Sequence, residues 1–189
     1  MSSAELLRAL VAALHQAGIP HMLTGSLAAA WYGARRATLD IDLVVEMQAH
    51  RISALIEAIS GPDVYVSPDA AREALNTESM FNVIDTGTGW KADLIIRKSR
   101  PFSRTEFGRR RPVEFEGVGL WIATPEDLII AKLEWAKLGA SARQIEDVRA
   151  LMRVTGPMLD RKYLERWIAE LGLADEWRTA RPESGPIPD

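Results

Sequence analysis

The chain has 189 residues, of which 47% are hydrophobic, and it carries a formal net charge of −3. This length allows one substantial core, or a core domain with a small helical appendage. Cysteine is absent, which excludes disulfides, thiolate zinc sites and cysteine nucleophiles, and the acidic balance argues against a dedicated DNA- or RNA-binding domain.

Hydropathy gives no sign of a membrane segment. No run of the sequence approaches the roughly 18 apolar residues that cross a bilayer. Residues 1–5 lack the basic region of a secretory signal. A cysteine-free chain also suits a reducing compartment. We therefore expect a cytoplasmic protein without a membrane partner.

The first 45 residues alternate between helical and extended patterns. Apolar residues at helical spacing predict a helix over 4–17, and Gly18 stands where a helix commonly ends. The run 39–45 is rich in β-branched residues and alternates with period two, which predicts a strand. Between these elements we expect a buried strand over 19–23, a turn at 24–26, a short alanine-rich helix over 27–32 and a loop over 33–36.

The middle of the chain predicts a mixture of helices and strands. Gly61 and Pro62 end a helix that begins at about residue 49. The other expected elements are a strand over 63–66, a helix over 68–75, strands over 80–85 and 91–96, and a hairpin through 113–115 and 120–122. Residues 1–123 thus predict an α+β domain with an α/β-like core, in which helices flank a mixed sheet.

The sequence becomes helical from Thr124 onward. Thr124 is a suitable cap, Pro125 stands at the first helical position, and two acids follow in the first turn. Ser141 and Asp160 open two further helices. We expect a helical subdomain over 124–180. Three of the last eight residues are proline, so the tail 181–189 is expected to be disordered.

A pair of carboxylates marks the strand over 39–45. Residues i and i+2 of a strand point to the same face, so Asp40 and Asp42 should lie side by side while Ile41 points to the other face. Two adjacent carboxylates repel each other, and burying them unpaired is costly. A divalent cation resolves this conflict, and Mg²⁺ commonly binds one or two carboxylates together with substrate phosphates.

A glycine–serine turn precedes this strand. Gly25 lets the backbone approach a ligand closely, the Ser26 hydroxyl can add a hydrogen bond, and the start of a helix suits a phosphate group. Arg36, just before the acidic strand, is a further candidate for neutralising phosphate charge, whereas Arg35 is expected to be solvated.

A third acid stands on a later expected strand. Asp93 has apolar neighbours and can complete a metal site or act on an acceptor hydroxyl. The alternative is an edge-strand acid that pairs with Lys91 or Arg97.

The motif Leu23-Thr24-Gly25-Ser26, then Gly33, Arg36, Thr38 and Asp40-Ile41-Asp42-Leu43, resembles the nucleotidyltransferase superfamily related to DNA polymerase beta. It looks closest to the bacterial minimal and AbiEii-like toxin branch. The resemblance implies that Gly25 and Ser26 bind the triphosphate, that Asp40 and Asp42 bind metal, and that Asp93 is the third acid.

The same branch implies a site role for residues on later helices. Lys132, followed by Arg143 and Asp147, looks similar to a lysine, a basic residue and an aspartate of that branch. Two structural explanations are alternatives to this interpretation. Lys132 can extend its ammonium group to solvent beside apolar neighbours, and Asp147 can pair with Arg143 on its own helix. The chain is shorter than the AbiEii-type toxins.

These residues predict transfer of a nucleoside monophosphate from a nucleoside triphosphate to a hydroxyl group, with Mg²⁺ or Mn²⁺ as cofactor. The acceptor can be a tRNA, a protein or a small molecule, and an antitoxin protein is a possible partner. One alternative is a nucleotide-binding or toxin–antitoxin module that transfers nothing, and another is an adenylyltransferase that modifies antibiotics. The run Arg109–Arg111 can guide a polyanionic acceptor, although a solvated loop is the simpler interpretation.

Overall fold

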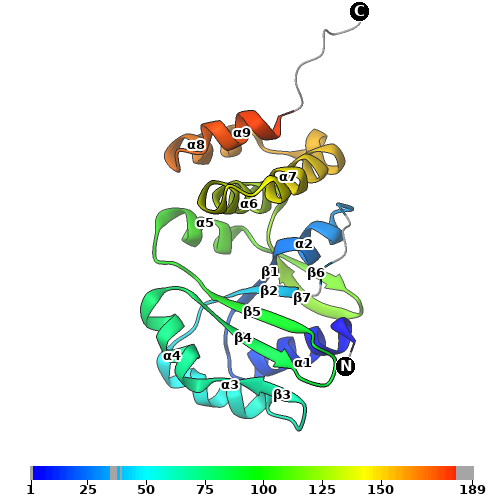
Figure 1. Cartoon of the computed structure of the whole chain (residues 1–189), viewed down its shortest axis with the longest axis vertical. Helices are drawn as coiled ribbons and strands as arrows, with labels where there is room; N and C mark the ends of the chain where they lie inside the picture. The colour runs from blue at the N-terminus through cyan, green and yellow to red at the C-terminus, as the bar shows by residue number, and fades with distance from the viewer. Residues whose placement is uncertain (1, 35–37, 39, 182–189) are drawn as a thin grey trace, which may run out of the picture. The chain divides into compact units, whose positions relative to one another are not determined.

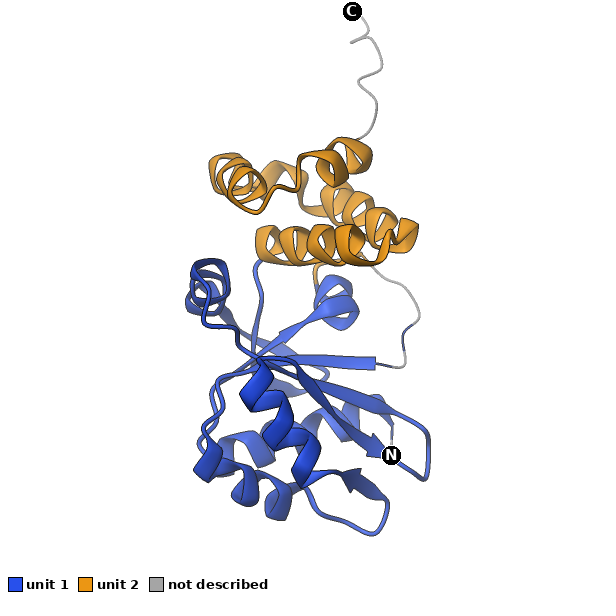
Figure 2. Cartoon of the chain, turned by 60° about the vertical axis from the view of Figure 1, so that its left-hand side comes forward, with its two compact units in different colours: residues 1–31, 35–124 blue, residues 32–34, 125–189 orange. Residues whose placement is uncertain are grey.

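The computed structural model describes residues 2–34, 38 and 40–181. The chain divides into two compact units (Figure 2). Unit 1 comprises residues 1–31 and 35–124, and unit 2 comprises residues 32–34 and 125–189.

The described part of unit 1 contains a seven-stranded mixed sheet with the strand order β3-β4-β5-β2-β1-β7-β6 (Figure 1). β2 runs parallel to β5 and antiparallel to β1, and β1 runs parallel to β7. The strands are β1 (His21–Thr24), β2 (Asp40–Val45), β3 (Val64–Val66), β4 (Met80–Asp85), β5 (Lys91–Ile96), β6 (Arg111–Phe115) and β7 (Val118–Ile122). Because β2 lies between β1 and β5, residues from three strands can meet on one face of the sheet.

The helices of unit 1 follow from local signals in the sequence. They are α1 (Ser3–Gln16), α2 (Gly25–Trp31), α3 (Ile52–Ile59), which follows a 3₁₀ turn over Ala49–Arg51, α4 (Pro68–Thr77) and α5 (Pro101–Arg109). Ser2 and Glu5 form a capping box at the start of α1, and one stripe of α1 is buried. In Figure 1, α1, α3 and α4 lie together on one side of the sheet.

Unit 2 is helical. It contains α6 (Pro125–Gly139), α7 (Ala142–Thr155), a 3₁₀ turn over Gly156–Met158, α8 (Arg161–Glu170) and α9 (Ala174–Ala180). Two buried acids of α6 connect it to α8: Glu126 accepts a hydrogen bond from the Asp160 amide, and Asp127 accepts one from the Tyr163 hydroxyl. These bonds compensate the cost of burying two carboxylates.

The predicted fold class is confirmed, since a mixed sheet is flanked by helices and a helical segment follows it. Two elements differ from the prediction. The sequence pattern did not predict α5, and α9 forms a separate short helix after α8. Among the described residues, no helix is both long and apolar enough to cross a bilayer.

Candidate active site

The two aspartates of β2 lie on one face of the sheet, as their spacing predicts. Asp40 is exposed and Asp42 is half-buried, while Ile41 between them is completely buried. The alternation places both carboxylates opposite the apolar layer that Ile41 joins. The start of β2 thus carries two acids on one face, while the other face of the strand is buried.

The glycine–serine turn lies against Asp42. Thr24, at the end of β1, is the register partner of Asp42 on β2. Gly25 has a φ of +66°, and a Cβ atom on this residue would lie 2.6 Å from the Asp42 Cγ and would overlap a carboxylate oxygen. Only glycine combines this backbone conformation with this contact. A glycine is therefore required where the turn contacts Asp42.

Ser26 follows as the second residue of α2, and its side chain is 4% exposed. Since α2 has only seven residues, we attribute any phosphate binding to the local amide groups and the hydroxyl group rather than to the helix as a whole.

Asp93 lies beside Asp42. Parallel pairing of β2 with β5 makes Asp93 the register partner of Asp42 and Lys91 the register partner of Asp40. Asp93 is 8% exposed. Its Oδ1 accepts a hydrogen bond of 2.5 Å from the Asn82 amide nitrogen on β4. The structure thus brings Asp40, Asp42 and Asp93 onto one face of two adjacent strands.

Lys91, which the sequence suggested only as an alternative partner of Asp93, lies on the same face of the sheet. Its Nζ lies 3.2 Å from Asp93 Oδ1 and 3.6 Å from Asp40 Oδ1. Burial lowers the pKa of Lys91, but the hydrogen bond and charge of Asp93 and the charge of Asp40 outweigh burial, so the pKa is raised. Its position two residues before Asp93 on a strand is the local signal for this pairing, whereas its contact with Asp40 depends on the strand register.

The donor set of this face fits a magnesium ion that also binds phosphate. The described residues contain no group of three or more carboxylate or imidazole side chains that could hold a metal ion by themselves. Mg²⁺ does not need such a group, because it commonly takes one or two carboxylates and completes its shell with substrate phosphates and water. Asp40 and Asp42, next to the tight Gly25 turn, meet that requirement.

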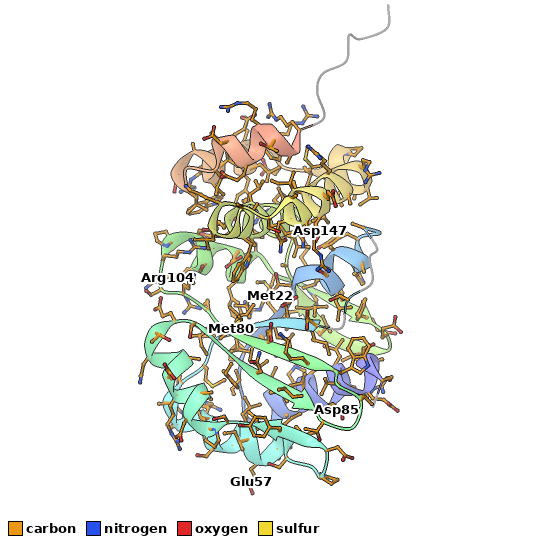
Figure 3. All side chains as sticks on the ribbon, viewed as in Figure 1. Met22, Glu57, Met80, Asp85, Arg104 and Asp147 are labelled. Carbon is orange, nitrogen blue, oxygen red and sulfur yellow. The ribbon has the colours of Figure 1, made fainter. Side chains whose placement is uncertain are left out.

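Two predicted site residues fall outside the described part of unit 1. Arg36, with Arg35, lies outside the described residues. Lys132 belongs to unit 2, where its Nζ donates a 2.7 Å hydrogen bond to Asp147 Oδ2 and a 3.4 Å bond to Gln144 Oε1. Asp147 is labelled on α7 in Figure 3. The similarity of these two residues to a family motif thus coincides with an ion pair between α6 and α7.

We expect Lys132→Met to lower the free energy of unfolding by about 3–5 kcal/mol, because it removes one partner of a buried ion pair. The side chains of Lys132 and Asp147 are 6% and 13% exposed. Urea denaturation measures this change. The double variant Lys132→Met/Asp147→Leu should recover part of the loss. A variant of unchanged stability that binds nucleotide more weakly would instead assign Lys132 to the nucleotide.

The arginine run is not a solvated loop. Arg109 ends α5 and Arg111 begins β6. Between them, the half-buried guanidinium group of Arg110 stacks 4.1 Å from the Phe107 ring centroid and 5.1 Å from that of Trp121. Arg110 therefore contributes to packing within unit 1.

Comparisons with known proteins identify solved structures of similar fold. Neither a protein-family model nor a curated protein matches the sequence. The solution structure of the antibiotic-resistance factor ANT(2'')-Ia matches with a TM-score of 0.60 at 13% identity, over 95% of this chain and 98% of that chain. The crystal structure of ANT(2'')-Ia in complex with adenylyl-2''-tobramycin matches with a TM-score of 0.58 at 15% identity, over 94% and 99% of the two chains.

A third solved structure is an antigenic nucleotidyltransferase-like protein from Paracoccidioides brasiliensis. It matches with a TM-score of 0.57 at 18% identity, over 95% of this chain and 94% of that chain. At these identities the matches establish the fold alone. The chain has the fold of the nucleotidyltransferases.

Proposed function

We propose that the protein transfers a nucleoside monophosphate from a nucleoside triphosphate to a hydroxyl group, with Mg²⁺ or Mn²⁺ as cofactor. The observation that carries the proposal is the register of β1, β2 and β5. This register sets Asp42 beside Asp93 and presses the Gly25 turn against the Asp42 carboxylate. Acids for a metal ion and a turn for a phosphate thus share one corner of the sheet.

Each residue has a role in this reaction. Asp40 and Asp42 would hold the divalent ion, which, when bound, offsets negative charge on the triphosphate. The amide groups of Gly25 and Ser26 and the Ser26 hydroxyl would bind phosphate oxygens. Arg36 and Lys132 are proposed as further nucleotide-binding residues on the resemblance alone.

Asp93 would act on the acceptor. Its carboxylate would take the proton of the acceptor hydroxyl as that oxygen attacks the α-phosphorus. The bond from the α-phosphorus to the bridging oxygen breaks, and pyrophosphate leaves with the electron pair. Asn82 and Lys91 keep the Asp93 carboxylate oriented by hydrogen bonds at 2.5 Å and 3.3 Å. Most of the rate gain in such a reaction comes from positioning and charge stabilisation.

The acceptor defines two candidate functions. The sequence resemblance favours an AbiEii-like toxin that modifies a tRNA or a protein and pairs with an antitoxin. The match to ANT(2'')-Ia over nearly the full length of both chains favours a small-molecule acceptor such as an aminoglycoside hydroxyl. A module that binds nucleotide but transfers nothing is the alternative to both.

Transfer of label tests the proposal directly. The purified chain is incubated with Mg²⁺, each of the four α-³²P-labelled nucleoside triphosphates, and total RNA, total protein or an aminoglycoside. We expect label on one class of acceptor and release of pyrophosphate. Binding of nucleotide without transfer to any acceptor would favour the non-catalytic module.

A further inference from the structure

Lys91 holds a fixed place between two of the three acids. It is the register partner of Asp40 across the β2–β5 pair and precedes Asp93 by two residues on β5, so all three side chains leave the same face. The strand pairing therefore sets the base of the Lys91 side chain next to both carboxylates. Its ammonium group contacts both of them, at 3.6 Å from Asp40 Oδ1 and 3.2 Å from Asp93 Oδ1.

The oxygen atoms of Asp93 are already engaged. Oδ1 accepts the Asn82 hydrogen bond and faces Lys91 Nζ, while Oδ2 lies 3.3 Å from the same Nζ. A magnesium ion that bridged Asp40 and Asp93 would need to lie about 2.1 Å from an oxygen of each acid. It would compete with the ammonium group for the same lone pairs. Asp42 lies against the Gly25 turn.

We propose that the Lys91 ammonium group takes the place of a second metal ion between Asp40 and Asp93, so that the site binds one divalent ion with each triphosphate. This inference rests on the proposed function. The single ion is held on the nucleotide side by Asp40 and Asp42, and Lys91 is a positioning residue on the acceptor side. Asp93, which the sequence predicts as a metal ligand, then acts on the acceptor hydroxyl.

The positive charge of Lys91 opposes the binding of a second divalent ion. Before a nucleotide binds, three carboxylates and one ammonium group leave a formal charge of −2 on this face. Adding a second divalent ion would place it next to the ammonium group, and like charges at such distances repel. Replacing Lys91 by a neutral side chain of similar length removes this repulsion and frees the two acids for a second ion.

The test counts bound Mn²⁺ by electron paramagnetic resonance, with the full chain and a non-hydrolysable ATP analogue. We expect one Mn²⁺ per chain in the wild type and in Lys91→Arg, and a second Mn²⁺ in Lys91→Met. Lys98→Met, which removes an exposed lysine just beyond β5, is the matched control and should keep one. Circular dichroism confirms that each variant is folded.

The outcomes separate the inference from the proposed function. Two Mn²⁺ in the wild type, or no change in Lys91→Met, would overturn the role of Lys91 and leave metal-dependent transfer standing. No bound Mn²⁺ in any variant would overturn both. A second ion in Lys91→Arg would also contradict the inference, because that variant retains the positive charge.

Discussion

Replacement of Asp42 by asparagine should lower the rate of nucleotide transfer by about 10³-fold, equivalent to about 4 kcal/mol of transition-state stabilisation. The change keeps the shape of the side chain but removes the charge that we assign to the divalent ion. Initial rates with labelled nucleotide measure this loss, and circular dichroism confirms that the variant is folded.

The matched control for Asp42→Asn is Glu46→Gln. Glu46 stands one residue after β2, is exposed, and pairs with Arg97 at 2.6 Å. Loss of an exposed pair costs at most about 1 kcal/mol and should leave the transfer rate within twofold of wild type. Equal losses of rate in the two variants would mean that Asp42 has no special role.

Alanine at position 25 should abolish nucleotide binding and lower the free energy of unfolding by about 1–3 kcal/mol. The new methyl group would overlap the Asp42 carboxylate, and alanine would have to adopt a φ of +66°. Either the turn or the acid must move, and both belong to the proposed site. Calorimetric titration with nucleotide and thermal denaturation measure the two losses.

Gly89→Ala separates crowding from backbone strain. Gly89 has a φ of +78°, but a Cβ atom there would meet nothing within 4 Å. The strain alone should cost about 1 kcal/mol of stability and leave nucleotide binding unchanged. If Gly25→Ala and Gly89→Ala bound nucleotide equally well, the contact between Gly25 and Asp42 would not be needed for nucleotide binding.

The acidic strand could be predicted from the sequence because its signals are local. The period-two alternation fixes which face Asp40 and Asp42 share, and the buried Ile41 on the other face agrees with it. The glycine–serine turn is likewise a short-range signal. The fold class followed from the order of such local patterns along the chain.

The rest of the site depends on contacts between distant segments. Strand pairing decides that Lys91 stands opposite Asp40 and that Asn82 reaches Asp93, and no local pattern gives this register. The ion pair of Lys132 with Asp147 joins two helices, so no pattern within either helix predicts it.

The helix α5 was missed for a different reason. Its buried side chains include Phe102 and Phe107, which are five residues apart and form only a weak helical stripe. Pro101 at its first turn was the available start signal, and the arginine run at its end suggested a loop instead.

Calorimetric titration of the chain with ATP, CTP, GTP and UTP, with and without Mg²⁺, tests most directly whether Asp40 and Asp42 hold a metal ion against a triphosphate. At least one nucleotide should bind in the presence of Mg²⁺, bind far more weakly in its absence, and lose its Mg²⁺-dependent binding to the double variant Asp40→Asn/Asp42→Asn. Equal binding of all four nucleotides by the wild type and the folded double variant would contradict the account.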